Sequence, residues 1–117
     1  ADLARIGEMV LGGGRVGTVR IVSRRWIEDS LAAIVPIAAV DRYADHYGYL
    51  WYRKTHHIGV ESITVHFASG NGGNKIYVVP AHRMVVAITS SAYGQPHGQP
   101  RSEQILLRIL AATRRPR

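Results

Sequence analysis

Two nearly continuous apolar runs, residues 75–79 and 84–90, are separated only by Pro80-Ala81-His82-Arg83. Runs without polar alternation are typical of strands that are covered on both faces. The connection is too short for a crossover helix, so the two strands are expected to pair antiparallel. A chain with this pair is built around an antiparallel sheet that needs a covering layer on each side.

Two further strands are predicted upstream, at residues 47–54 and 60–69. The first is rich in aromatic residues. In the second, apolar and polar residues alternate, as expected for a strand with one buried face. The apolar set is Ile63, Val65 and Phe67, and the polar set is Ser62, Thr64 and His66. Residues 35–46 and the Gly/Pro/Gln-rich segment 94–100 are predicted to be loops.

Three helices are predicted around these strands. The first spans residues 2–11, begins at a cap on Asp2 and ends at Gly12-Gly13-Gly14, because glycine is costly inside a helix. An extended link, residues 16–22, leads to a second helix, residues 24–33, capped by Ser23. The third runs from a cap on Ser102 to Thr113. Their predicted buried faces are Leu3, Ile6, Met9 and Val10; Trp26, Ile27 and Leu31; and Ile105, Leu106, Ile109 and Leu110.

The order of helix, helix, four antiparallel strands and helix predicts an α+β fold, with an antiparallel sheet flanked by helices. The 117 residues fit one domain or a piece of one. No apolar run is long enough for a transmembrane span, and no signal peptide is visible in these residues. Because the chain starts at Ala1 directly in a helical pattern, we expect a partial domain, residues 1–117, cut from a longer protein.

Composition excludes several classes of function. There is no cysteine, which rules out disulfides, thiolate metal sites and cysteine nucleophiles. The net charge of +7 comes mainly from scattered arginines, and the only tight cluster is Arg114-Arg115-Pro116-Arg117. No aromatic-interleaved basic motif of the RNA-binding type is present, so nucleic acid is not the expected partner.

No cofactor or metal ion is predicted. The six histidines show no His-Glu-x-x-His motif and no cluster with carboxylates, and His56 and His57 are expected in a hairpin loop. The glycine-rich segment 69–74 fits neither a Walker A loop nor a dinucleotide fingerprint. Both of those lead into a helix, whereas this segment leads into a strand.

Acyl transfer is the chemistry that the segment Ser69-Gly70-Asn71-Gly72-Gly73-Asn74 could serve. Serine hydrolases need backbone N–H groups aimed at the developing oxyanion. Glycines let a substrate carbonyl approach the backbone closely, because they carry no Cβ. A plain glycine hairpin turn is the alternative, and the residues alone leave both open.

The order of motifs resembles the C-terminal part of the class C-type serine β-lactamase-related, penicillin-binding-protein-like hydrolases. The resemblance rests on "DLARIGEMVLGGGRVGTVRIVSRRWIEDSL", "YGYLWYRK", "FASGNGGNKIYVVP" and "MVVAITSSAYG" in series, followed by a closing helix. It covers nearly the whole chain. It implies the C-terminal part of a β-lactamase/transpeptidase-like α/β domain. Such enzymes cleave ester, amide or β-lactam bonds in small molecules through an acyl-enzyme.

The resemblance also implies site residues. Ala68-Ser69-Gly70 is similar to the family's third signature, Lys/His-Thr/Ser/Gly-Gly, on a strand that lines the cleft. Ala68 departs from it, which removes the cation used in penicillin-type carboxylate recognition and favours the esterase or amidase branches. Asn71, or Gly72 as the alternative, would supply one oxyanion N–H. The implied oxyanion and cleft residues are therefore Ser69, Gly70, Asn71 and Gly72, with Tyr47, Tyr49, Trp51 and His66 as further candidates. Aromatic packing on a half-buried sheet is the alternative for the tyrosines and Trp51.

The family's nucleophile motif, Ser-x-x-Lys, and its Tyr-x-Asn motif are absent from this chain. In the family both lie upstream of the matched region, so we expect a segment that is inactive alone and prone to self-association. Ser69 is not predicted to be the nucleophile, because no base stands beside it at a recognisable spacing. A periplasmic or secreted parent would fit. The alternatives are a non-catalytic scaffold that keeps the fold and a basic nucleic-acid-binding module.

Overall fold

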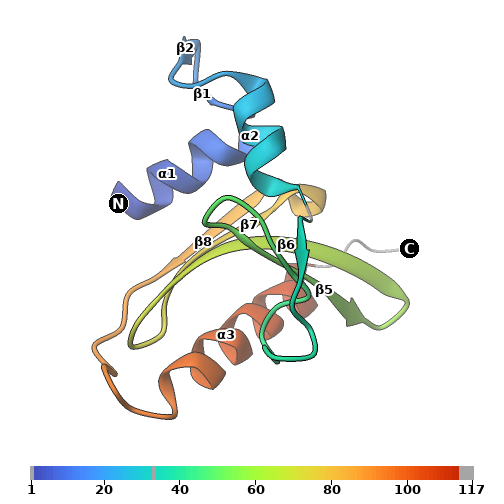
Figure 1. Ribbon diagram of the computed structural model, residues 1–117, viewed down its shortest axis with the longest axis vertical. Coiled ribbons are helices and arrows are strands. Elements are labelled where there is room, and N and C mark those ends of the chain that lie inside the picture. Colours follow the sequence, from blue (N-terminus) through green and yellow to red (C-terminus); the bar gives the residue numbers. More distant parts are fainter. Residues whose placement is uncertain (1, 33, 114–117) are drawn as a thin grey trace.

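The computed structural model describes residues 2–32 and 34–113 (Figure 1). The arginine cluster at residues 114–117 lies outside the described residues. In chain order the elements are α1 (Asp2–Leu11), β1 (Arg15–Val16), β2 (Val19–Arg20), α2 (Arg24–Leu31), β3 (Val35–Pro36), β4 (His46–Tyr47), β5 (Tyr52–Ile58), β6 (Glu61–Gly70), β7 (Asn74–Val79), the 3-10 turn η1 (Pro80–His82), β8 (Met84–Ile88) and α3 (Gly98–Thr113).

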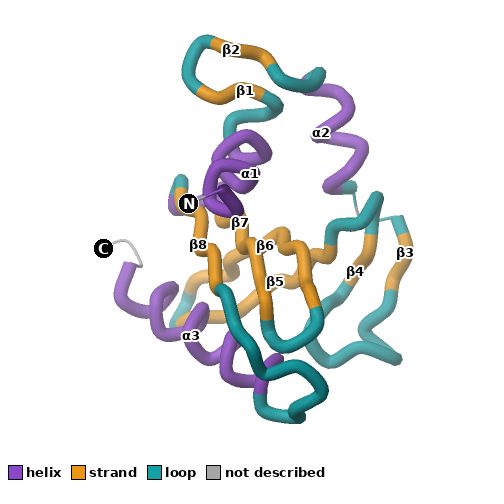
Figure 2. Tube along the Cα trace, turned by 90° about the vertical axis from the view of Figure 1, so that its left-hand side faces the viewer, coloured by secondary structure: helices purple, strands orange, loops and turns teal. Residues whose placement is uncertain are grey.

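Strands β3 to β8 form one antiparallel sheet in sequence order, and β1 and β2 form a separate small hairpin. Helices α1 and α2 lie over one face of the large sheet and α3 lies over the other (Figures 1 and 2). The predicted α+β class, with an antiparallel sheet flanked by helices, is therefore confirmed. None of the helices in residues 2–32 and 34–113 is long and apolar enough to cross a bilayer.

The main core lies between the sheet and α3. The alternation predicted for β6 is confirmed, because Ile63, Val65 and Phe67 are all buried. They pack with Tyr77 and Val79 of β7 and with Leu106 and Leu110 of α3. A smaller core on the other face joins Val10 of α1, Ile27 of α2 and Val78 of β7. Strand β7 is thus covered on both faces as predicted, whereas β8 is only half-buried.

The first two helices begin and end near the predicted residues. Gly13 and Gly14, both at positive φ, close the C-terminus of α1. The Ser23 hydroxyl accepts a hydrogen bond from the Trp26 N–H, which confirms the predicted cap of α2. The buried faces were predicted only in part, because Ile6 is exposed and Trp26 is 55% exposed. Asp2 is the first residue of α1 rather than its cap.

Residues 35–46, predicted as a loop, contain β3 and the first residue of β4, which pair with each other. Two further boundaries were predicted wrongly. The aromatic run 47–54 is interrupted by a turn, in which the Gly48 N–H donates to the Trp51 carbonyl and Leu50 takes a positive φ of 66°. Helix α3 begins at Gly98 instead of after Ser102. Pro100 falls in its first turn, where a missing N–H costs nothing. Ser102 is consequently a buried interior residue of the helix.

Candidate functional site

We call residues 69–75 the glycine turn; they comprise the end of β6, a three-residue loop and the start of β7. Its three loop residues are Asn71, Gly72 and Gly73, and both glycines are buried with φ of +86° and +89°. A Cβ on Gly73 would stand 2.5 Å from the Gly98 carbonyl oxygen of α3. Both glycines are therefore required here, Gly73 for its close approach to α3 and both for their backbone conformation.

Side chains from two elements, β7 and α3, hold this turn in one shape. Asn74 donates to the carbonyls of Asn71 at 2.7 Å and Ser90 at 3.0 Å, and its Oδ1 accepts from the Ser90 N–H at 2.9 Å. From α3, the Ser102 hydroxyl donates to the Gly73 carbonyl at 2.6 Å. Gln99 of the same helix donates to the Gly70 carbonyl at 3.2 Å. The turn is thus a fixed structure and not a loose connection.

The N–H groups at the tip of the turn are unengaged. Among residues 2–32 and 34–113, no group accepts a hydrogen bond from the backbone N–H of Asn71 or Gly72. Asn71 itself is exposed at the surface. A fixed backbone N–H that has no acceptor within the protein can donate to a ligand oxygen without prior rearrangement.

Ser69 and Lys75 face each other across the hairpin. Their Cα atoms are register partners, and the Lys75 Nζ donates to the Ser69 Oγ at 2.7 Å. Ser69 is exposed, whereas Lys75 is only 3% exposed, with its Nζ 4.9 Å from the centroid of the Phe67 ring. Burial lowers the pKa of Lys75 to about 8, against an opposing effect of the nearby Asp41 and Glu103 carboxylates.

Lys75 was not predicted as a residue of this site. The length of the hairpin loop could have indicated this lysine. A three-residue loop between paired strands sets residue 70 opposite residue 74 and residue 69 opposite residue 75. Lys75 therefore stands beside the Ser69 hydroxyl although no recognisable spacing along the chain indicates it. Spacing along the chain does not reveal a partner across a hairpin.

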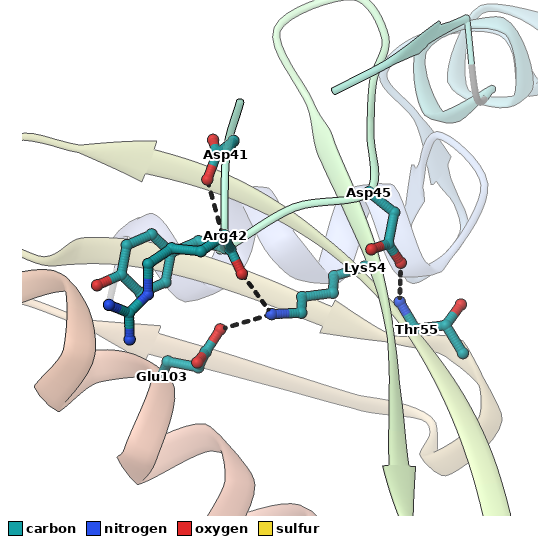
Figure 3. A network of polar contacts seen from close by, with 7 residues as sticks. Asp41, Arg42, Asp45, Lys54, Thr55 and Glu103 are labelled. Carbon is teal, nitrogen blue, oxygen red and sulfur yellow. Dashed lines mark hydrogen bonds and ion pairs between the residues drawn. The ribbon is translucent and has the colours of Figure 1, made fainter. Parts of the chain in front are cut away.

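A polar network fixes the loop that covers Lys75 (Figure 3). Lys54 donates to the Arg42 carbonyl at 2.7 Å and forms an ion pair with Glu103 of α3 at 3.3 Å. Asp45 accepts from the Thr55 N–H at 2.9 Å, and Asp41 accepts from the Tyr43 N–H at 2.8 Å. Together these contacts hold the Tyr43 ring with its centroid 6.0 Å from the Lys75 Nζ.

The other predicted cleft residues do not gather around the glycine turn. The Tyr49 ring lies tilted against the Trp26 ring of α2, and Trp51 packs against the smaller core below α1 and α2. His66 pairs with Val78 of that core, so strand alternation places it on the sheet face opposite the Ser69 side chain. The Tyr47 ring packs against the Tyr52 ring in a tilted arrangement, as the packing alternative predicted.

A shallow depression of about 250 Å³ adjoins the turn. It lies between Leu3 of α1 and the ends of β6 and β7, at Ala68, Ser69 and Gly70. Three of the four predicted oxyanion and cleft positions, Ser69, Gly70 and Asn71, are exposed at this end of the sheet, whereas Gly72 is buried beneath them.

The histidines form no metal site in the described residues, where no group of three or more metal-ligating side chains occurs. The loop position expected for His56 and His57 was wrong, because both lie in β5. His56 is buried, and desolvation lowers its pKa, with Lys54 as the next cause. His57 is exposed and shares a hydrogen bond with Ser62.

His66 makes stability sensitive to acid. Its Nδ1 is buried without a hydrogen-bond partner among the residues that the structure describes. Desolvation together with the charge of Arg53 lowers the pKa of His66 to about 4 from 6.5. The unfolded chain therefore binds more protons than the folded one between these values. Stability is lost as the pH falls from about 6.5 to about 4.

We expect His66→Gln to lose less stability than the unsubstituted chain over this pH range. Thermal melts at pH 7, 5.5 and 4 measure the difference, and His97→Gln, at an exposed position, controls for removing a histidine. Equal acid sensitivity of His66→Gln and the unsubstituted chain would show that His66 is not the group responsible.

Neither a scan against protein-family models nor a search of curated proteins finds a match for this chain. Its function therefore has to be inferred from the glycine turn and the order of its motifs.

Proposed function

We propose that this chain is the C-terminal part of a serine hydrolase of the β-lactamase-related type. The parent enzyme cleaves ester, amide or β-lactam bonds through an acyl-enzyme, and this segment supplies one wall of its cleft. The observation that carries the proposal is the glycine turn, because it combines a rigid backbone with N–H groups that have no acceptor in the described protein.

Such a turn suits the stabilisation of an oxyanion. The transition state of acyl transfer places negative charge on the former carbonyl oxygen, and a preorganised N–H lowers its energy without reorganising. One donor of this kind is typically worth about 3–4 kcal/mol of transition-state stabilisation. Asn71 is the donor that we assign, because it is exposed at the tip, and Gly72 lies directly behind it.

The nucleophile is assigned to the upstream part of the parent protein and not to Ser69. At neutral pH Lys75 is mainly protonated, because its pKa of about 8 lies above 7. A protonated amine donates to the Ser69 oxygen and cannot remove its proton. Ser69 therefore serves as a hydrogen-bonding group of the cleft wall.

Exposed apolar side chains support the view that further protein covers this segment. Five large apolar side chains on α2 and the segments that follow it are about half exposed or more. They are Trp26, Ile34, Val35, Tyr49 and Leu50. Trp26 and Tyr49 are in ring contact, and contiguous exposed apolar groups mark interaction surfaces. The rest of the parent domain would cover them, and in its absence the segment would associate with itself.

Ester hydrolysis tests the proposal. The protein expressed from its natural translational start should release p-nitrophenol from p-nitrophenyl acetate with a burst equal to the enzyme concentration, followed by slower turnover. Residues 1–117 alone should show neither phase. Absence of a burst from both proteins would contradict the proposal and favour a non-catalytic scaffold, whereas salt-sensitive DNA binding would favour the nucleic-acid module.

A further inference from the structure

The pair formed by Lys75 and Ser69 joins a buried cation to an exposed hydroxyl. Among the described residues Lys75 has no ion-pair partner, and its one hydrogen bond goes to the Ser69 oxygen. A buried charge without a carboxylate partner is costly, so the structure maintains this arrangement against a free-energy penalty. Such groups recur at functional sites.

The direction of this hydrogen bond determines what Ser69 offers to a ligand. Because Lys75 donates, it occupies a lone pair of the hydroxyl oxygen and leaves the Ser69 proton free to donate elsewhere. The only acceptor for that proton in the described residues is the Gln99 Oε1 at 3.5 Å, which is the limit of hydrogen-bond distance. A ligand oxygen can therefore replace Gln99 at little cost.

We propose that Lys75 is a positioning residue that holds the Ser69 hydroxyl as a donor to a small oxyanion, such as a carboxylate, bound at the glycine turn. The inference rests on the proposed function only in taking this turn as the ligand-facing wall. Lys75, on the neighbouring strand, supplies a positive charge near Ala68, the position where the resemblance leads one to expect a cation. A charge-assisted chain from the lysine through the hydroxyl to the ligand is stronger than a neutral hydrogen bond.

The groups around Lys75 fit this role. Phe67 and Ser69 face it from β6, Tyr43 and Asp41 from the covering loop, and Glu103 from α3. The two carboxylates help to keep the amine charged, but neither lies close enough to form an ion pair with it. The charge of Lys75 is therefore available to polarise the hydroxyl.

The same geometry predicts a pH limit. Below pH 8 the amine is charged and the hydroxyl points its proton outward. Above about pH 8 the neutral amine can accept the Ser69 proton, and the hydroxyl then presents lone pairs, which repel an oxyanion. Binding of an oxyanion at the turn should weaken as the pH rises through about 8.

Acetate binding to the 117-residue chain tests the inference. At pH 6.5, acetate should shift the backbone amide resonances of Ser69, Gly70 and Asn71 in a saturable way. Lys75→Met and Ser69→Ala should each bind roughly tenfold more weakly, the factor expected for losing one charge-assisted hydrogen bond. Arg108→Met removes a positive charge at an exposed position of α3 and serves as the control, with acetate affinity unchanged.

A direct titration of the lysine side-chain resonances gives a second, independent readout. Lys75 should titrate near pH 8, and Ser69→Ala should lower its pKa further, because the charged amine loses its acceptor. Acetate affinity unaltered by Lys75→Met, no saturable shift in the unsubstituted chain, or a Lys75 pKa unaltered by Ser69→Ala would each overturn the inference. Acetate binding as expected, together with a parent that shows no burst, would overturn the proposed function alone.

Discussion

Gly73→Ala is expected to lower the free energy of unfolding by about 2–5 kcal/mol. About 1–2 kcal/mol comes from forcing a residue with a Cβ to a positive φ, and about 1–3 kcal/mol comes from overpacking. The contact is with backbone, because the new Cβ would stand 2.5 Å from the Gly98 carbonyl oxygen. Urea denaturation of both proteins measures the difference.

Gly94→Ala is the matched control for this substitution. Gly94 also has a positive φ, +69°, but nothing lies within 4 Å of the position of its Cβ. It should therefore show the conformational cost alone, about 1–2 kcal/mol. Equal losses for the two variants would contradict the close contact between the glycine turn and α3.

Leu106→Ala is expected to destabilise the protein by about 2–5 kcal/mol, the range for removing a buried leucine side chain. Leu106 is 0% exposed and lies in the core between α3 and the sheet. Its neighbour Ile105 is 38% exposed on the same helix, so Ile105→Ala should cost much less. A similar loss for both variants would place α3 in a different orientation on the sheet.

Strands β5 to β8 were predictable because their pattern is local and strong, whereas the two-residue strands β3 and β4 carry no such pattern. The alternation around Val65 and the apolar run of β7 determined which face each residue occupies, and the short segment at Pro80 determined the antiparallel pairing. These features depend on sequence separation of a few residues, which a single chain reveals directly.

The errors arose where tertiary packing overrides a local pattern. Ser102 looks like a cap, but its hydroxyl satisfies the carbonyl of Gly73, far away in the sequence, while the helix starts earlier at Gly98. Trp26 looks buried by its size, yet α2 presents it to solvent. No local signal distinguishes these outcomes, because both depend on what lies opposite.

The candidate site was predictable in position but not in chemistry. The glycines at 72 and 73 marked a turn of unusual backbone geometry, as the structure shows. The partner of Ser69 could be found only from the register of the hairpin, which places Lys75 opposite it. The aromatic residues assigned to a cleft lie instead in packing contacts around Trp26 and Tyr52.

The most direct test of the central proposal is the intact mass of the protein after incubation with a serine-reactive fluorophosphonate. The proposal predicts that the protein expressed from its natural start gains one adduct, mapped by peptide mass to a serine upstream of Ala1 that is followed three residues later by lysine. Residues 1–117 alone should gain none, and Ser69→Ala in the longer protein should still be labelled. No adduct on the longer protein, or an adduct that maps to Ser69, would contradict the proposal.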